Sequence, residues 1–351
     1  MNTTFDSAKD CKLLFDSAVR NESALILLRA KLTVIAQRLG LAELKIENML
    51  LVASELVSNN IKYAGARGMI QVWQQPGPVL DLVSLDYGPG IANLEHAEQD
   101  GFSTGNTLGK GLGSVRRLSD ELFIFTQQHD TVSKTKWSGT VFLARFFPQN
   151  SKVAGEREPL PGFRLGMFSR AYSSSRFNGD RIYLNLDGKR LNWLHLDGLG
   201  HGEGAQKTTA SLAAHLVQES SPGAVLKAVD RQLEGTRGAV AVAGEIHLAQ
   251  HTVQIVGVGD MHAHVYDKKH IDDVPFVPGI LGREHRTMSL FQAKFGKQSL
   301  VITASDGIRR NWDTTSFVGL FNQHPQLIAY VLGNIMSRVS DDQSLCVLTA
   351  G

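Results

Sequence analysis

The sequence has little of what marks secreted, membrane-spanning or nucleic-acid-binding proteins. Only two cysteines, Cys11 and Cys346, occur in 351 residues, and they lack the paired spacing of a zinc site or redox motif. Neither sign of charge dominates, because 36 basic residues face 34 acidic ones. No single-sign field therefore favours nucleic acid or an anionic membrane as partner, and we expect neither.

Long uncharged runs are also absent. Charged residues interrupt the apolar stretches of the first thirty positions, which argues against a signal peptide, and no run is long enough to span a bilayer. The pattern predicts a cytoplasmic protein. With 42% hydrophobic residues in 38.4 kDa, the chain can bury more than one core, so two domains are expected.

A stretch poor in apolar residues divides the chain. Residues 148–162, PQNSKVAGEREPLPG, combine prolines, glycines and charges with almost nothing to bury. We therefore predict a first domain over residues 1–148, a linker over 149–161 and a second domain over 162–351. Short strands are expected in the second domain, with helical stretches near residues 203–218 and 222–234.

A helix with one apolar face is predicted in the first half. Residues 44–64, LKIENMLLVASELVSNNIKYA, place apolar side chains at intervals of three and four. Glu55 and Asn59 are four apart and project one turn from each other. Taken alone, this pair is explained as a solvent-exposed polar stripe.

Two glycine turns follow that helix. Residues 79–91, VLDLVSLDYGPGI, form a strand that ends in Asp86 beside backbone freed of side chains. The segment GKGLGSV, residues 109–115, then opens a second helix whose backbone amides can face phosphate. The ordered set of an acidic helix and two glycine turns predicts a nucleotide site.

These motifs resemble the GHKL ATPase superfamily, and within it the serine kinases of bacterial partner-switching systems, the RsbT type above all. The resemblance spans residues 15–147 and implies a Bergerat α/β sandwich that binds ATP and Mg²⁺. It implies that Asp86 receives the adenine amino group, that Asn59 ligates Mg²⁺ and that Glu55 is the general base. The implied backbone contacts to base and phosphates come from Gly88, Gly90, Gly109, Lys110, Gly111, Leu112 and Gly113. A histidine kinase shares this fold, but residues 1–50 contain no phosphoacceptor histidine.

The second half carries a different glycine loop. WLHLDGLGHGEGA, residues 193–205, lacks the glycine spacing of a dinucleotide loop and the Lys-Ser/Thr end of a Walker loop. It remains suited to present Asp197 and the carbonyl of Gly198 to a cation. Comparable strand-end positions hold Asp180, Asp306 and the pair Asp341-Asp342. A turn or cap explains any one of these aspartates, but not the ordered set.

This order resembles the metal-dependent PPM serine/threonine phosphatases, in the SpoIIE-like branch that includes the RsbX type. The resemblance covers residues 162–351 and implies an α-β-β-α sandwich with a two-metal site, so the fold class expected for the whole chain is α+β. Asp197 is then a catalytic residue that bridges both metals, and the other implied ligands are Asp180, Gly198, Asp306 and Asp341. An all-oxygen set favours Mn²⁺ or Mg²⁺, which would activate a water for in-line attack.

Some assignments in this half stay open. Asn178-Gly179-Asp180 replaces the commoner Gly-Gly-Asp, and Asp341 is preferred to Asp342 only through alignment of the following Ser344. His201 is expected to have a structural or substrate-orienting role. His262 and His264 lie on one face of a strand and are expected to face solvent.

Kinase and phosphatase halves in one chain imply opposed reactions on one class of target. The hypothesis is that the chain phosphorylates and dephosphorylates a STAS-domain partner, with a sigma factor or its regulator downstream. Two alternatives stay open. The ATP domain sequesters a partner stoichiometrically, as anti-sigma factors do, or ATP binding only gates the phosphatase.

Overall fold

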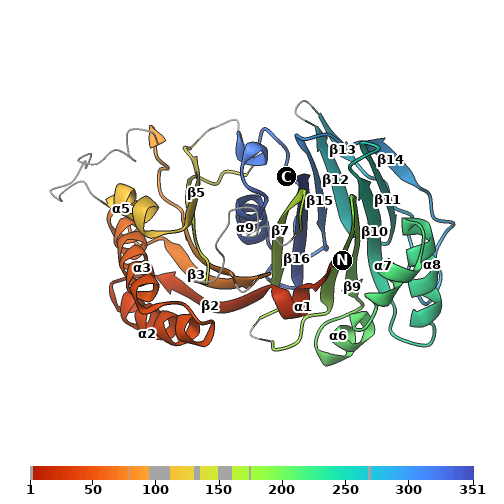
Figure 1. Ribbon diagram of the computed structural model, residues 1–351, viewed down its shortest axis with the longest axis horizontal. Coiled ribbons are helices and arrows are strands. Elements are labelled where there is room, and N and C mark those ends of the chain that lie inside the picture. Colours follow the sequence, from red (N-terminus) through yellow and green to blue (C-terminus); the bar gives the residue numbers. More distant parts are fainter. Residues whose placement is uncertain are drawn as a thin grey trace. The chain divides into compact units, whose positions relative to one another are not determined.

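The chain folds into two compact units (Figure 1). The computed structural model describes residues 3–77, 79–94, 111–129, 135–148, 160–173, 175–267 and 270–351. The N-terminal unit comprises residues 13–157 and 314–323, and the C-terminal unit comprises residues 1–12, 158–313 and 324–351. This division differs from the one drawn on sequence, because residues 1–12 and 314–323 each belong to the unit formed by the other half of the chain.

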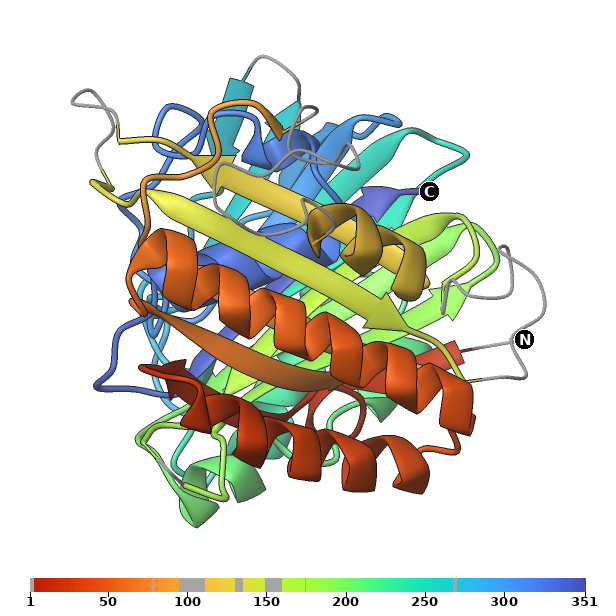
Figure 2. The same ribbon diagram turned by 90° about the vertical axis from the view of Figure 1, so that its left-hand side faces the viewer.

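The N-terminal unit is a sheet covered by helices. Within the described residues the sheet has five strands in the order β2 (Lys12–Val19), β3 (Gly68–Gln75), β4 (Val79–Asp86), β6 (Gly139–Phe146) and β5 (Glu121–Gln127). Figure 2 shows the helices in front of one sheet face, and they are α2 (Ser23–Arg38), α3 (Glu43–Ala64) and α5 (Gly111–Leu118). The predicted β4 strand does end at Asp86.

The predicted amphipathic helix is confirmed as α3. Its apolar stripe, which includes Met49, Val52 and Leu56, is buried in the core between the helices and the sheet. The helix ends at Gly65, whose φ of 62° is a left-handed conformation that glycine adopts without steric cost. Packing of the apolar stripe therefore fixes which way the polar face of α3 points.

Residues 314–323 complete the N-terminal unit. Phe317 is fully buried, and its ring centroid lies 6.4 Å from that of Phe125 and 6.5 Å from that of Trp137. The carbonyl of Ser316 accepts hydrogen bonds from Gln127 Nε2 and Thr135 Oγ1. A short 3₁₀ turn, η2 (Leu320–Asn322), follows.

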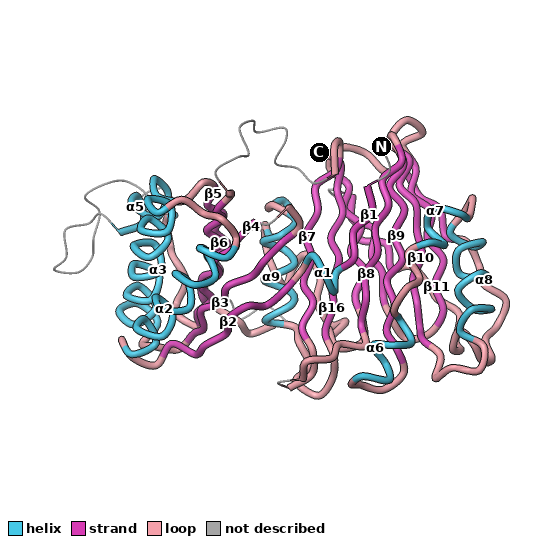
Figure 3. The backbone as a smooth tube through the Cα atoms, turned by 60° about the horizontal axis from the view of Figure 1, so that its bottom comes forward, coloured by secondary structure: helices cyan, strands magenta, loops and turns pink. Residues whose placement is uncertain are grey.

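The C-terminal unit is a sandwich of two antiparallel sheets. One sheet has the order β1 (Thr3–Asp6), β8 (Asp180–Asp187), β9 (Arg190–Gly198), β10 (Ala239–His247), β11 (Thr252–Val258) and β14 (Phe291–Lys294). The other has the order β13 (His270–Asp273), β12 (His262–Asp267), β15 (Ser299–Ala304), β16 (Gln343–Ala350) and β7 (Phe163–Arg170). Figure 3 shows both sets of strands in magenta.

Helices cover the outer faces of this sandwich. Helix α8 (Pro222–Leu233) packs on β10 and β11, and α9 (Pro325–Ile335) packs on β7 and β16 (Figure 1). The helical stretch expected near residues 203–218 forms two short helices, α6 (Glu203–Thr209) and α7 (Ala214–Gln218). The fold class is α+β, as expected. Among the described residues, no helix combines the length and apolarity needed to cross a membrane.

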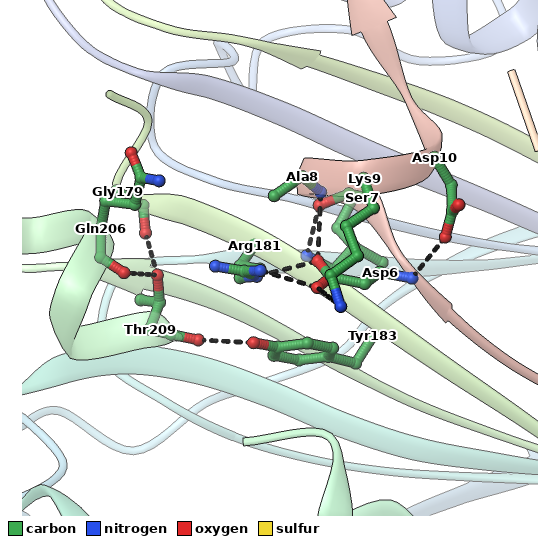
Figure 4. Close-up of polar contacts among 11 residues, drawn as sticks. Asp6, Ser7, Ala8, Lys9, Asp10, Gly179, Arg181, Tyr183, Gln206 and Thr209 are labelled. Carbon is green, nitrogen blue, oxygen red and sulfur yellow. Dashed lines mark hydrogen bonds and ion pairs between the residues drawn. The ribbon is translucent and has the colours of Figure 1, made fainter. Parts of the chain in front are cut away.

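The start of the chain is bound into the C-terminal sandwich. Strand β1 pairs with β8, and the short helix α1 (Ser7–Asp10) follows it. Arg181 on β8 donates to both carboxylate oxygens of Asp6, and Tyr183 on the same strand donates to the carbonyl of Thr209 in α6 (Figure 4). The N-terminal strand and α6 are therefore both held against β8.

Two expectations about single residues can be compared with the structure. His262 and His264 were expected to face solvent, but both are buried, so that prediction is wrong. They do share one face of β12, and they pack there against Trp312, whose ring centroid lies 4.7 Å from that of His264. Cys11 and Cys346 are free and buried, in keeping with ordinary thiols.

Candidate functional sites

The strand-end turn after β4 fixes Asp86. Its Oδ1 accepts hydrogen bonds from the backbone amides of Gly88, at 2.8 Å, and Thr140, at 3.2 Å. Burial raises the pKa of this carboxyl, and the two amide bonds and the charge of Arg67 oppose the rise. Because Oδ1 makes both of these bonds, the carboxylate is locked in one orientation.

The neighbouring strands crowd the backbone of this turn. Trp137 Nε1 donates to the carbonyl of Asp86, and Ser138 Oγ donates to that of Gly88. A Cβ added at Gly90, whose φ is 76°, would lie 2.4 Å from the carbonyl oxygen of Gln127. The glycine is thus required both by its left-handed backbone and by this close approach.

The polar face of α3 meets the start of α5. A Cβ added at Gly111, the first residue of α5, would lie 2.9 Å from Glu55 Oε2 and 4.0 Å from Asn59 Oδ1. Glu55, Asn59 and Gly111 therefore lie together, although the sequence separates the last from the first two by about fifty residues. A carboxylate, an amide oxygen and a helix N-terminus in one place suit a phosphate with its cation.

The remaining predicted nucleotide contacts are described only in part. Gly109 and Lys110 lie outside the described residues. Leu112 packs partly buried against the core, and Gly113 lies in the first turn of α5. The structure therefore brings the polar face of α3 to the beginning of α5, and the Asp86 turn lies against the end of α3, where a Cβ added at Gly88 would be 3.1 Å from that of Ala64.

The second site is a cleft at one end of the C-terminal sandwich. Asp180, the first residue of β8, is the register partner of Asp197 near the end of β9. Asp197 lines a cleft of about 530 Å³ together with Asp306, which follows β15, and Asp341, which precedes β16. Strands from both sheets thus bring the predicted carboxylates to one place.

Asp260 also lines this cleft, and sequence reasoning missed it. It follows β11 in a Gly-Asp pair, so it shows the same strand-end pattern as the predicted aspartates. Gly259 before it has a φ of 98°, and a Cβ there would overlap Val240 at 2.1 Å. The strand-end Gly-Asp pattern could have identified this residue.

The carboxylates of the cleft raise one another's pKa. Burial, followed by the charges of Asp180, Asp306, Asp341 and Asp260, raises the pKa of Asp197 well above its usual range. Burial raises the pKa of Asp180 to about 7, and the hydroxyls of Ser305 and Ser344 oppose that rise. Such a cluster of carboxylates is electrostatically costly unless protons or cations compensate it.

A divalent cation fits this donor set. Asp180 Oδ1 is buried and has no hydrogen-bond partner among the described residues. In the same part of the chain, no three His, Cys, Asp or Glu side chains form a ready-made metal site, so the shell would be completed by carbonyls and water. Oxygen donors with retained waters are what Mg²⁺ and Mn²⁺ accept.

Asp341 and Asp342 have different surroundings. Asp341 lines the cleft, whereas Asp342 is buried and accepts hydrogen bonds from two backbone amides, Tyr172 N at 2.6 Å and Gly179 N at 2.7 Å. Each of these bonds uses a different carboxylate oxygen of Asp342. Asp342 therefore shapes the loop before Asp180, and Asp341 is the residue that faces the cleft.

The Gly198 loop lies against the loop before β8. Gly198 N donates to the carbonyl of Gly179, which also accepts from Thr209 Oγ1, a bond that Figure 4 shows. A Cβ at Gly198 would lie 2.7 Å from the carbonyl oxygen of Ala205, so only glycine fits there. The His201 ring lies 5.4 Å from that of Tyr172, which supports a structural role for it.

Comparison with solved structures concerns the fold. A chain from a study of the bacterial stressosome, a modular system adapted to control secondary messenger signaling, has 23% identity and a TM-score of 0.50. The match covers 53% of this chain and 98% of that one. A structure of RsbX in complex with magnesium has 18% identity and a TM-score of 0.49, over 54% of this chain and 96% of that one. At 23% identity, the likeness to the chain from the stressosome study concerns the fold alone.

Comparison with protein families concerns the N-terminal unit. Residues 19–136 match the model of the histidine kinase-like ATPase domain. The serine/threonine-protein kinase RsbT of Bacillus subtilis (strain 168) is 37% identical over 89 residues, which are 25% of this chain and 67% of RsbT. The chain belongs to the family of histidine kinase-like ATPases that includes RsbT.

Proposed function

We propose that this chain is a bifunctional regulator of partner switching. Its N-terminal unit phosphorylates serine or threonine on a STAS-domain protein with ATP, and its C-terminal unit removes that phosphate by metal-dependent hydrolysis. The observation that carries the proposal is the presence of two assembled polar sites in one chain: Glu55 and Asn59 against Gly111, and aspartates from both sheets around one cleft. The similarity to RsbT, a serine/threonine-protein kinase, supports the kinase half.

In the kinase reaction, Asp86 would orient the adenine and the amides of α5 would face the phosphates. Asn59 would hold a Mg²⁺, which would neutralise the charge of the phosphates during transfer. Glu55 would take the proton of the substrate hydroxyl while the hydroxyl oxygen attacks the γ-phosphorus and ADP leaves. The position of Glu55 beside Gly111 puts the base next to the expected phosphate contacts.

In the phosphatase reaction, Asp197, Asp306 and Asp341 would hold divalent cations in the cleft, with Asp180 and the Gly198 carbonyl beside them. The bound cations would neutralise phosphoryl oxygens and lower the pKa of a water. The reaction consumes one water, whose oxygen joins the phosphorus and whose proton goes to the leaving serine oxygen, and the role of Asp197, Asp306 and Asp341 would be to hold the cations. No covalent intermediate with the chain is required.

One experiment separates the two activities. The full chain is incubated with γ-labelled ATP, Mg²⁺ and a cognate STAS protein, and the purified phosphoprotein is then offered with Mn²⁺. We expect Glu55→Ala to abolish labelling and leave dephosphorylation intact, and Asp197→Ala to do the reverse. Absence of labelling by wild type would reject the kinase half, and absence of Mn²⁺-dependent release would reject the phosphatase half.

The same variants test the two alternatives. A protein that only sequesters its partner would bind the STAS protein or a sigma-factor regulator equally well after Glu55→Ala, and its signalling would survive. A phosphatase gated by ATP would release phosphate faster with a non-hydrolysable ATP analogue and would never label its partner. The closeness of Glu55 to the start of α5 favours turnover over both.

A further inference from the structure

His195 lies in the middle of the C-terminal sandwich and links its two sheets. It is fully buried on β9, two residues before Asp197. Its Nδ1 lies 2.9 Å from Thr303 Oγ1 on β15, and its Nε2 lies 2.7 Å from Ser344 Oγ on β16. This fully buried histidine therefore has a polar partner on each of two strands of the opposite sheet.

The chain of hydrogen bonds continues to a predicted metal ligand. Ser344 Oγ donates to Asp180 Oδ2 at 2.7 Å. The serine hydroxyl has one proton, so once it is given to Asp180 the oxygen can only accept from His195. Nε2 must therefore carry the ring proton, and Nδ1 must accept from the Thr303 hydroxyl.

The two carboxylate oxygens of Asp180 differ in their hydrogen bonds. Oδ2 is held by Ser344, whereas Oδ1 is buried without a hydrogen-bond partner among the described residues. Ser344 is itself fixed, because its amide donates to Ser305 Oγ and its carbonyl accepts from the Ser305 amide. The network thus fixes the rotation of the Asp180 carboxylate and leaves one oxygen for another ligand.

We infer that His195 is a positioning residue that acts through Ser344 to present Asp180 Oδ1 to the divalent cation of the phosphatase site. The inference rests on the proposed phosphatase function. Outer hydrogen bonds that orient a ligand change metal affinity by roughly 10- to 100-fold when they are removed. A residue that only fills the core would instead change stability and leave metal affinity unaltered.

The test is Mn²⁺ binding to the full chain by titration calorimetry. Ser344→Ala and His195→Leu are expected to weaken binding by roughly 10- to 100-fold. His195→Gln, whose amide can donate from nearly the same position, is expected to recover most of the loss. Because His195 and Ser344 act through the same series of hydrogen bonds, the double variant should bind Mn²⁺ no more weakly than the weaker of the two single variants. Ser344→Ala keeps the test decisive if His195→Leu does not fold.

The matched control is Thr349→Val. Thr349 lies near the opposite end of β16 from Ser344, and its buried hydroxyl donates to the carbonyl of Ser299. It should leave Mn²⁺ affinity within about twofold of wild type. A folded Ser344→Ala variant with wild-type affinity would overturn the inference and leave the phosphatase proposal standing. A wild type that binds no Mn²⁺ would overturn both.

A second readout does not depend on metal. Nitrogen NMR of the metal-free chain should show the ring proton of His195 on Nε2, and Ser344→Ala should perturb that resonance. A proton on Nδ1 instead would reverse the direction of every bond in the network. That result would overturn the inference whatever the phosphatase assays give.

Discussion

Asp180 and Asp197 are directly opposite each other on the adjacent antiparallel strands β8 and β9. Like charges at such positions destabilise a sheet, and here burial and further aspartates raise the pKa of both carboxyls. The fold therefore keeps an arrangement that is unfavourable in the absence of a cation. This is expected of a metal site whose carboxylates lower the stability of the metal-free fold.

Asp197→Asn tests this trade. Removing one charge should raise the free energy of unfolding of the metal-free chain, because the repulsion from Asp180 and Asp306 is relieved. Wild type should instead gain about 2.7 kcal/mol when Mn²⁺ is present at 100 times its Kd, and the variant should gain almost nothing. Urea unfolding with EDTA and with Mn²⁺ measures both effects. Asp187→Asn, at the exposed end of β8, is the control. A variant less stable than wild type in EDTA would contradict the argument.

Burial of His262 should lower the free energy of unfolding of the protein in acid. It is buried beside His264, with Asp273 bonded to His264 and the charge of Arg310 close enough to act on both rings. Burial lowers the pKa of His262 from 6.5 to about 3. Below pH 6.5 the unfolded chain therefore binds a proton that the folded chain does not. The free energy of unfolding should fall by about 1.4 kcal/mol per pH unit in that range from this group alone.

Comparison of two variants isolates this contribution. His262→Gln cannot titrate, so its free energy of unfolding should fall less steeply between pH 6.5 and 5 than that of wild type. His270→Gln, whose side chain is 75% exposed, should follow wild type. Urea unfolding at several pH values gives the slopes. Equal slopes for wild type and His262→Gln would show that the buried ring is charged in the folded state.

Local patterns predicted the elements that carry the sites. The three-four spacing of apolar residues predicted α3 because that helix packs its stripe on strands close by, and strand-end glycines predicted the positions of Asp86 and Asp197. Asp260 was passed over because a Gly-Asp pair after a strand is also ordinary turn chemistry. Alternation put His262 and His264 on one face, but only packing against Trp312 decides that this face is buried.

Long-range pairing could not be predicted. The strand TTFD of β1 is too short to show alternation, and its pairing with β8 depends on Arg181 holding Asp6 across about 175 positions. The same holds for residues 314–323, which follow a strand of the C-terminal unit and complete the N-terminal unit. A domain boundary placed at a proline-rich linker therefore cannot show that residues 1–12 belong to the C-terminal unit or that residues 314–323 belong to the N-terminal unit.

Gly111→Ala should impair the kinase without unfolding it. The added methyl would lie 2.9 Å from Glu55 Oε2, so the expected base must move. A displacement of about 1 Å costs a reaction up to roughly 100-fold in rate. Alanine is also the better helix former, so stability should not fall. Gly223→Ala is the matched change, since it lies near the start of α8 and its Cβ would meet nothing within 4 Å. Unchanged labelling of the STAS protein by Gly111→Ala would remove Glu55 from the role of base.

Phe317→Ala should weaken the N-terminal unit, although its position in the chain is in the C-terminal half. Loss of a fully buried phenylalanine costs about 3 to 5 kcal/mol. The ring supports Trp137, whose indole donates to the carbonyl of Asp86, so ATP affinity should also fall. Nucleotide titration followed by Trp137 fluorescence, together with thermal unfolding, checks both. Val318→Ala, at a residue 71% exposed, should change neither. Wild-type ATP affinity in a folded Phe317→Ala variant would uncouple this segment from the Asp86 turn.

Asp341→Asn should lower Mn²⁺ affinity, whereas Asp342→Asn should lower the stability of the fold. Asp341 lines the cleft and raises the pKa of Asp197, so its neutral variant should lose Mn²⁺ affinity while the metal-free chain keeps or gains stability. Asp342 receives a backbone amide on each oxygen, and an asparagine can accept only one of those bonds while its own amide group faces the other donor. That variant should lose about 1 to 3 kcal/mol of stability, because a buried donor is left unpaired. Calorimetric Mn²⁺ titration and urea unfolding of both variants separate the two roles, and a greater loss of Mn²⁺ affinity from Asp342→Asn would exchange them.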